Sequence, residues 1–211
     1  MSVSPAALAA TIAIAASVAG PMYAQTTTRV SVDSTGAEGN GKSFGGVSAV
    51  SADGRYVVFS SEASNLVAND NNGCRDIFVL DRATGTTQRV SVDSAGIEAN
   101  ADSFADEFVI SADGRFVAFT SFASNLVAND TNLAMDIFVH DRVTGTTERA
   151  NVDSSGNQAA GGLAPPDSHN PEISRDGAIV SFCSSAANLV GSDTNGYFDV
   201  FVHDRSTGIT E

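Results

Sequence analysis

Short apolar runs and longer polar loops alternate along this chain, and the whole pattern returns three times. The runs 56–59 and 116–119 are apolar on both faces, and 179–182 matches them in register. Each is followed, after a polar loop, by a second apolar run at 77–80, 137–140 or 200–203. The units recur about every 60 residues, which marks a repeat architecture. The pattern predicts short strands that must be covered above and below.

An Asp-Gly pair precedes each of the first apolar runs, at 53–54, 113–114 and 176–177. This pair is a strong hairpin signal, because glycine accepts the positive φ of a tight turn. A more polar segment, Arg-Val-Ser-Val-Asp, stands at 29–33 and 89–93 and returns in weaker form at 149–153. Its alternation predicts a strand that is covered on one face only.

The sequence therefore predicts an all-β fold with four short strands in each unit. Sheets that cannot cover both faces alone must stack, and radial stacking of four-stranded sheets gives a β-propeller. Three blades are too few for a closed ring, which typically has four to eight. We expect either a piece of a longer propeller, two chains that exchange edge strands in a homodimer with six blades, or an open arc of three blades. The first is our preferred interpretation and the homodimer is the second.

The N-terminal stretch differs from the rest and is predicted to be a leader. Residues 5–21 carry no charge and are mostly Ala, Ile and Val, and a small residue, Ala24, stands at a plausible cleavage point. This is typical of a secretory signal peptide at 1–24. The remainder, 25–211, is the predicted propeller segment, with units at approximately 29–92, 93–152 and 153–211. We expect a secreted or periplasmic protein with no membrane span in the mature chain.

Composition restricts the class of partner. The formal net charge of −14 argues against nucleic-acid binding, which needs a basic face, and suits a protein that binds cations. Cys74 and Cys183 stand at different places in their repeats, so we do not expect them to form a disulfide.

The repeats resemble a known family. Ser-Ala-Asp-Gly-Arg followed by an aromatic strand, as at 51–59 and 111–119, and then Asp-Ile-Phe-Val, as at 76–79, are similar to the TolB-type, WD-repeat-like β-propeller repeats. The resemblance covers roughly 29–211. Alanine or arginine stands where the family often has proline in its turn, and the polar loop is longer. The resemblance implies an exported protein that works mainly by binding other proteins, although some relatives are propeller domains of enzymes.

Three Asp-x-Asn-x-x-x-Asp loops, each leading into an apolar strand, are the best candidate sites. Calcium takes six to eight oxygen ligands from carboxylates, amides and carbonyls, so each loop is a candidate Ca²⁺ site. In the alternative interpretation, which we rank slightly ahead, the same side chains only form turns and cap the strand. The nine residues are Asp70, Asn72, Asp76, Asp130, Asn132, Asp136, Asp193, Asn195 and Asp199.

Other polar residues are expected to be structural. His140 and His203 occupy the position that Leu80 has in the first unit, so an obligatory catalytic role is excluded. His169 lies in an irregular stretch and could line the centre of a ring, although we expect a solvated loop histidine. The Asp-Arg pairs at 81–82, 141–142 and 204–205 are expected to brace hairpins. No hydrolase elbow, phosphate loop or zinc motif is present.

These observations give two hypotheses from different classes. The first is an exported, non-enzymatic propeller that serves as a binding or scaffold segment for a protein or surface polysaccharide, with loops that hold calcium. The second is the propeller part of a larger secreted hydrolase or lyase whose catalytic residues lie outside this chain. Because a fold does not determine function, only the site can separate them.

Overall fold

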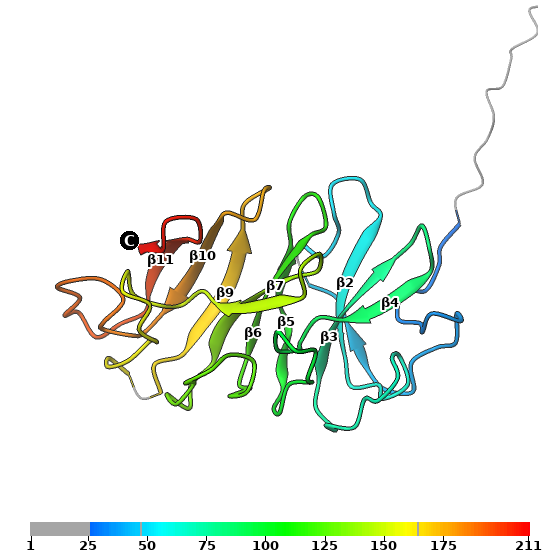
Figure 1. The fold of residues 1–211 in the computed structure, drawn as a ribbon, viewed down its shortest axis with the longest axis horizontal. Coiled ribbons are helices and arrows are strands. Elements are labelled where there is room, and N and C mark those ends of the chain that lie inside the picture. Colours follow the sequence, from blue (N-terminus) through cyan, green and yellow to red (C-terminus); the bar gives the residue numbers. More distant parts are fainter. Residues whose placement is uncertain (1–25, 47, 164) are drawn as a thin grey trace, which may run out of the picture.

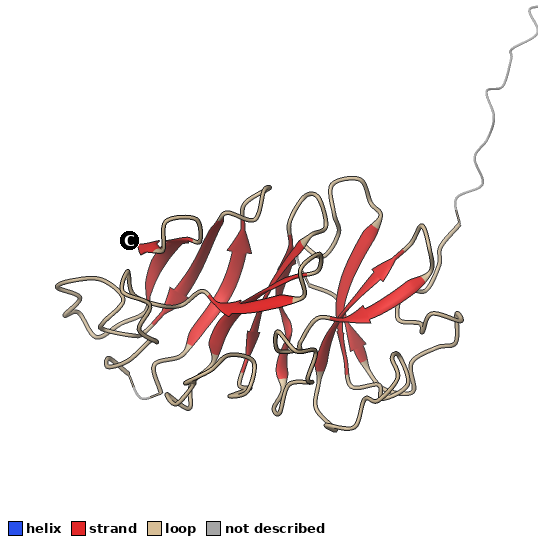
Figure 2. Ribbon diagram, in the orientation of Figure 1, coloured by secondary structure: helices blue, strands red, loops and turns tan. Residues whose placement is uncertain are grey.

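Three separate sheets make up the part of the chain that can be described. The computed structural model describes residues 26–46, 48–163 and 165–211, so the leader expected at 1–24 lies outside the described residues. Figures 1 and 2 show the sheets side by side in a row, with strands and loops only. Over these residues no helix is long and apolar enough to cross a membrane.

Each sheet has four antiparallel strands in simple sequence order. Blade 1 contains β1 (Ser43–Phe44), β2 (Tyr56–Ser61), β3 (Asp76–Asp81) and β4 (Thr86–Arg89). Blade 2 contains β5 (Ser103–Ile110), β6 (Phe116–Ser121), β7 (Asp136–Asp141) and β8 (Thr146–Arg149). Blade 3 contains β9 (Ser168–Ile173), β10 (Ile179–Ser184), β11 (Asp199–Asp204) and β12 (Ile209–Thr210).

The Asp-Gly turns form as the sequence predicts. In blade 1, Gly54 has a φ of 71°, and the Asp53 carboxylate accepts hydrogen bonds from the Ser51 hydroxyl and the Arg55 amide. The strand that leaves this turn, β2, pairs along its full length with β3. An arginine then braces the hairpin, because Arg55 donates two hydrogen bonds of 2.9 and 2.7 Å to Asp81. The expected bracing role of the aspartate is present, with Arg55 rather than Arg82 as its partner.

The apolar cores lie between neighbouring blades. One cluster joins Val58 and Ile77 of blade 1 to Phe119 and Phe138 of blade 2. The next cluster repeats this contact one blade further on, between blades 2 and 3. Because each blade buries one face against its neighbour, the arrangement is that of successive propeller blades. The three blades leave the ring open, as the sequence predicts.

The loop that follows the second strand is held against the sheet by the leucine of its Leu-Val pair. Leu66, Leu126 and Leu189 are each at most 2% exposed, so they belong to the core although they stand in loops.

The segment 29–33 is a correction to the sequence prediction. It contains only an isolated bridge between Val32 and Glu38, and in blades 1 and 2 the fourth strand ends at the arginine that opens this motif. The residues after it cross to the next blade. Ser91, which we placed on an exposed face, is fully buried and donates a hydrogen bond of 2.5 Å to Asp76. The alternation therefore comes from a packed connection and not from a half-covered strand.

Candidate functional site

The first acidic loop surrounds an arginine. Arg89, at the end of β4, places Nη1 at 3.2 Å from Asp70 Oδ1, 3.1 Å from Asp76 Oδ2 and 2.9 Å from Glu98 Oε2. Its side chain is only 9% exposed and that of Asp76 is fully buried. Asn72 donates a hydrogen bond of 2.9 Å to Asp76 and accepts one from the Cys74 amide. The guanidinium is thus the cation that this loop holds.

The second loop repeats this geometry. Arg149 Nη1 lies 3.2 Å from Asp130 Oδ1 and 3.2 Å from Asp136 Oδ2. Gln158 stands in the place of Glu98 and accepts a hydrogen bond from the same nitrogen. Burial and the neighbouring charge of Asp136 raise the pKa of Asp130 to about 6. Burial likewise raises the pKa values of Asp70 and Asp76 in the first loop.

These two loops do not fit a calcium ion. A bound Ca²⁺ would need the carboxylate oxygens that face Nη1 of Arg89 or Arg149, and a dication would lie against a buried guanidinium. Asn72 and Asn132 each accept a hydrogen bond from the amide two residues further on, as the turn interpretation expects. No group of three or more His, Cys, Asp or Glu side chains suited to a metal occurs in the described ranges.

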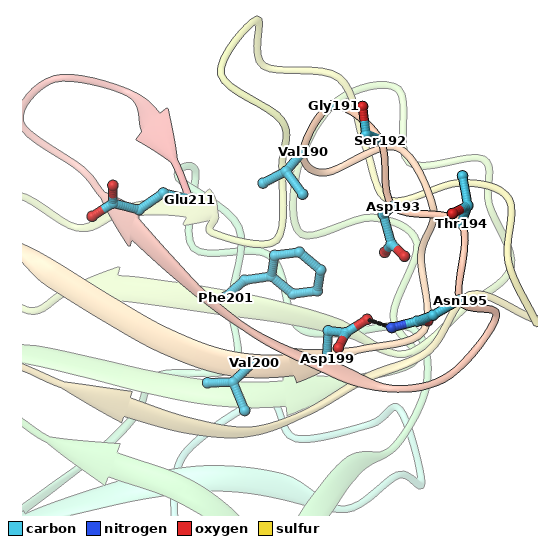
Figure 3. Close-up of a pocket in the computed structure, with 10 residues that line it drawn as sticks. All are labelled: Val190, Gly191, Ser192, Asp193, Thr194, Asn195, Asp199, Val200, Phe201 and Glu211. Atoms are coloured by element: carbon cyan, nitrogen blue, oxygen red, sulfur yellow. Dashed lines mark hydrogen bonds between the residues drawn. The ribbon is translucent and has the colours of Figure 1, made fainter.

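The third loop has the same acidic residues but a different environment. Asp193, Asn195 and Asp199 line an open pocket of about 350 Å³ at the edge of blade 3 (Figure 3). Asn195 donates a hydrogen bond of 2.7 Å to Asp199, as its equivalents do in the other loops. Across the described residues, no ion pair joins either aspartate to an arginine. Calcium binding at this loop stays a prediction.

The two repeated histidines are buried in the outer part of their blades. His140 is 2% exposed, and its Nδ1 lies 2.9 Å from the Thr147 hydroxyl. His203 makes the same contact with Thr210. Burial lowers the pKa of His140 to about 4 and also lowers that of His203. Like Leu80 in blade 1, His140 borders a shallow pocket at the edge of its blade, but the ring itself is almost fully buried.

A second candidate site lies where the first strands of blades 2 and 3 meet. His169 is in β9, not in the loop we expected, and its Nδ1 lies 3.2 Å from Glu107 Oε1 on β5. The ring of Phe104 stands edge-on to His169 with its centroid 6.3 Å away, and the centroid of the Phe198 ring lies 5.7 Å from that of His169. Glu107 and His169 side chains are 15% and 25% exposed, so solvent reaches both. A carboxylate, an imidazole and aromatic rings can together hold a polar ligand with an apolar face.

This cluster departs from the repeat, which is the signal that could have revealed it. The register position of His169 is a phenylalanine in the other two units, Phe44 and Phe104. Glu107 lies within an irregularity in the pairing of β5 with β6, which extends from Ser103 to Phe108. The strands β3, β7 and β11 keep nearly one sequence, whereas β1, β5 and β9 differ from each other. Chemistry that is specific to this chain is therefore concentrated on the first strands.

Comparison with known proteins gives no family by sequence. No family model matches the chain. No curated protein sequence matches it at a significant level either.

Several solved structures are similar in fold. A putative TolB from Agrobacterium tumefaciens is 18% identical, with a TM-score of 0.47 over 81% of this chain and 48% of that one. An oligogalacturonate lyase from Vibrio parahaemolyticus is 14% identical, with a TM-score of 0.47 over 82% of this chain and 40% of that one. The propeller domain of the Trilobed protease from Pyrococcus furiosus is 13% identical, with a TM-score of 0.42 over 75% and 38%.

The chain spans half or less of the length of these structures. They include a TolB protein and enzymes, so the likeness concerns the fold and not an activity. The described chain has the fold of an open β-propeller with three four-stranded blades, and its repeats resemble those of TolB-type propellers.

Proposed function

We propose that this chain is part of an exported, non-enzymatic propeller that binds another macromolecule along the first strands of blades 2 and 3. The observation that supports this most directly is the Glu107–His169 pair, 3.2 Å apart and flanked by aromatic rings. Export is proposed from the apolar leader at 1–24.

The surroundings of the pair favour recognition of a protein. Phe122 and Phe198 are 45% and 47% exposed, and Phe122 lies 5.9 Å from Phe104. Exposed aromatic side chains beside a charged group are typical of the residues that dominate protein interfaces. The net charge of −14 favours a partner with a basic or neutral surface.

Site-specific photocrosslinking can test this proposal. A photoreactive phenylalanine analogue at Phe122 should give a discrete crosslinked species in the organism's envelope fraction. The same analogue at Val143, which is 74% exposed on the β7–β8 turn, should not. Glu107→Gln should weaken the Phe122 crosslink, because a hydrogen bond to a charged group contributes about 1.5–3 kcal/mol, roughly ten- to a hundredfold in affinity. Equal yields at both positions, or yields that Glu107→Gln leaves unchanged, would contradict the proposal.

A second candidate is the propeller part of a larger hydrolase or lyase. The Glu107–His169 pair favours it to the extent that a carboxylate beside an imidazole can also move a proton. Sequencing of the intact gene decides between the two, because a catalytic domain outside residues 1–211 is required by the second candidate alone.

A further inference from the structure

Blade 1 holds a guanidinium on an aromatic ring and against a carboxylate. Arg75, which precedes β3, lies over the ring of Phe44 on β1, 5.4 Å from the ring centroid. Its Nη2 donates a hydrogen bond of 3.1 Å to Glu62, the residue that follows β2. A cation–π contact and a charge-assisted hydrogen bond are thus made by one planar group, which is a combination that suits arginine.

Blade 2 keeps the ring of this arrangement but not the guanidinium. Phe104 is the second residue of β5, as Phe44 is of β1, and Met135 stands where Arg75 stands in blade 1. The main chain shows that Met135 and Arg75 are equivalent, because their amides donate hydrogen bonds to the aspartates that precede β9 and β5. The sequence of blade 2 therefore supplies no cation of its own at this place.

The carboxylate of this region comes from Glu107 instead of Glu62. In place of Glu62, blade 2 has Phe122, whose ring centroid lies 5.9 Å from that of Phe104. Glu107 lies on the same strand as Phe104 and contacts the ring of His169, which stands edge-on to Phe104. Across the described residues, Glu107 makes no ion pair with an arginine or a lysine. Two phenylalanine rings and a carboxylate are thus grouped without the guanidinium that blade 1 holds.

The charge around this group is negative. Besides Glu107, β5 carries Asp106 and β9 carries Glu172, and both of these side chains are exposed. Neither strand contains a lysine or an arginine. Because the whole chain also has a formal net charge of −14, both the nearby carboxylates and the overall field attract a cation to these strands.

The group is accessible to a partner. Phe122 is exposed, Phe104 is half-buried, and solvent reaches the Glu107 carboxylate. All three residues belong to blade 2, which packs against blade 1 on one face and blade 3 on the other (Figure 1). Their surface therefore does not depend on where the printed sequence begins or ends.

We propose that an arginine side chain of a protein partner binds here, with its guanidinium against the Phe104 and Phe122 rings and hydrogen-bonded to Glu107. This inference rests on the proposed function and names the chemical group that the first strands recognise. The carboxylate has capacity for the added bonds, because it offers about four acceptor sites and is contacted here by His169 and the Asn170 amide. Arginine fits better than lysine, since a guanidinium is weakly hydrated, stacks on rings and bonds a carboxylate with two nitrogens.

A ligand-observed NMR titration of the whole chain tests this proposal. The probe is an end-blocked peptide with one arginine among glycine and serine, and its match contains citrulline, which has nearly the same shape but no charge. The arginine peptide should bind at least tenfold more tightly than the citrulline peptide, because the latter lacks both the cation–π contact and the charged hydrogen bond. A lysine peptide should bind more weakly than the arginine peptide.

Single substitutions locate the site. Glu107→Gln and Phe122→Ala should each remove most of the preference for arginine over citrulline. Because Phe122 is exposed, its variant remains informative even where Glu107→Gln disturbs β5, and circular dichroism shows whether each variant keeps its sheets. Glu148→Gln is the matched control, since it removes the same charge from an exposed position of β8 that Gln88 occupies in blade 1. It should leave the preference unchanged.

Equal affinity for the arginine and citrulline peptides overturns the inference. A preference that survives Glu107→Gln and Phe122→Ala also overturns it, as does one that Glu148→Gln reduces equally, because general attraction to an acidic chain would then explain the binding. The photocrosslink at Phe122 separates these results from the proposed function. A discrete crosslink without a preference for arginine overturns this inference alone, whereas the absence of any discrete crosslink contradicts the proposed function.

Discussion

Replacing Arg149 by methionine should destabilise the fold strongly. The guanidinium is 8% exposed and lies 3.2 Å from both Asp130 and Asp136, whose side chains are 5% and 0% exposed. Methionine keeps much of the apolar stem but leaves two buried carboxylates without their cation. Breaking a buried ion pair from one side costs about 3–5 kcal/mol. For a chain of this size, that loss corresponds to a decrease in melting temperature of roughly 6–20 °C.

The loss should depend on pH in a known direction. The pKa of Asp130 is about 6 in the folded chain even with Arg149 in place, above its ordinary value of 3.8. A carboxyl whose folded pKa is raised favours folding below its unfolded pKa, and this contribution is lost as pH rises through the folded value. Without the arginine the Asp130 carboxyl is still harder to ionise, because Arg149 lowers its pKa, so the deficit of Arg149→Met should be larger at pH 8 than at pH 5.

Urea unfolding followed by circular dichroism at pH 5 and pH 8 measures both quantities. Arg175→Met is the matched control, since Arg175 is exposed and makes no ion pair with any described residue. The further change Asp136→Asn in the Arg149→Met background should recover part of the loss at pH 8, because it removes one unpaired charge. A deficit below about 1 kcal/mol, or one equal at both pH values, would refute the claim that the guanidinium neutralises a buried acidic loop.

Three further predictions concern single positions. His140→Leu should make the free energy of unfolding less sensitive to acid. The pKa of His140 is about 4 in the folded chain against an ordinary value of 6.5, so the wild-type chain should lose up to about 3 kcal/mol of stability as the pH falls from 6.5 to 4. Urea midpoints that fall equally with pH in the wild type and the variant would contradict this. Leu133→Gly should raise the free energy of unfolding by about 0.5–1 kcal/mol, since Leu133 has a φ of 58° and is 86% exposed, whereas Leu133→Ala should give no such gain. Any rise in melting temperature that millimolar calcium causes should come from the third loop, so a rise that survives Asp199→Asn would contradict our assignment.

The repeat pattern was sufficient to predict the blades, because strand pairing follows directly from local spacing. Apolar residues on both faces of 56–59 and 116–119, an Asp-Gly turn before each and a polar loop after each predict the four-stranded units that the structure contains. Leu66 and its copies are buried in the core for a reason that is also local, because burying an apolar side chain of a polar loop against the sheet is favourable.

The candidate sites were harder to predict, because their partners are distant in sequence or off the repeat. The acidic loops were visible, but the cation that fills two of them is Arg89 or Arg149, on a strand that returns to the loop 13 residues after the last aspartate. Alternation suggested an exposed face for Ser91, which instead donates its hydroxyl proton to buried Asp76. Glu107 and His169 are 62 residues apart, and no periodicity relates them.

The turn at Gly114 has a consequence for how such chains can change length. A Cβ at this position would lie 2.1 Å from the Tyr56 ring of the preceding blade, and Gly177 stands against Phe116 in the same way. Each repeat thus carries a glycine turn on one face and, on the opposite face, the side chain that packs against the glycine turn of the next blade. Both are encoded within a single stretch of about 60 residues. A gene that duplicates or deletes one such stretch yields modules that still dock without compensating substitutions, so this architecture can gain or shed blades in whole steps.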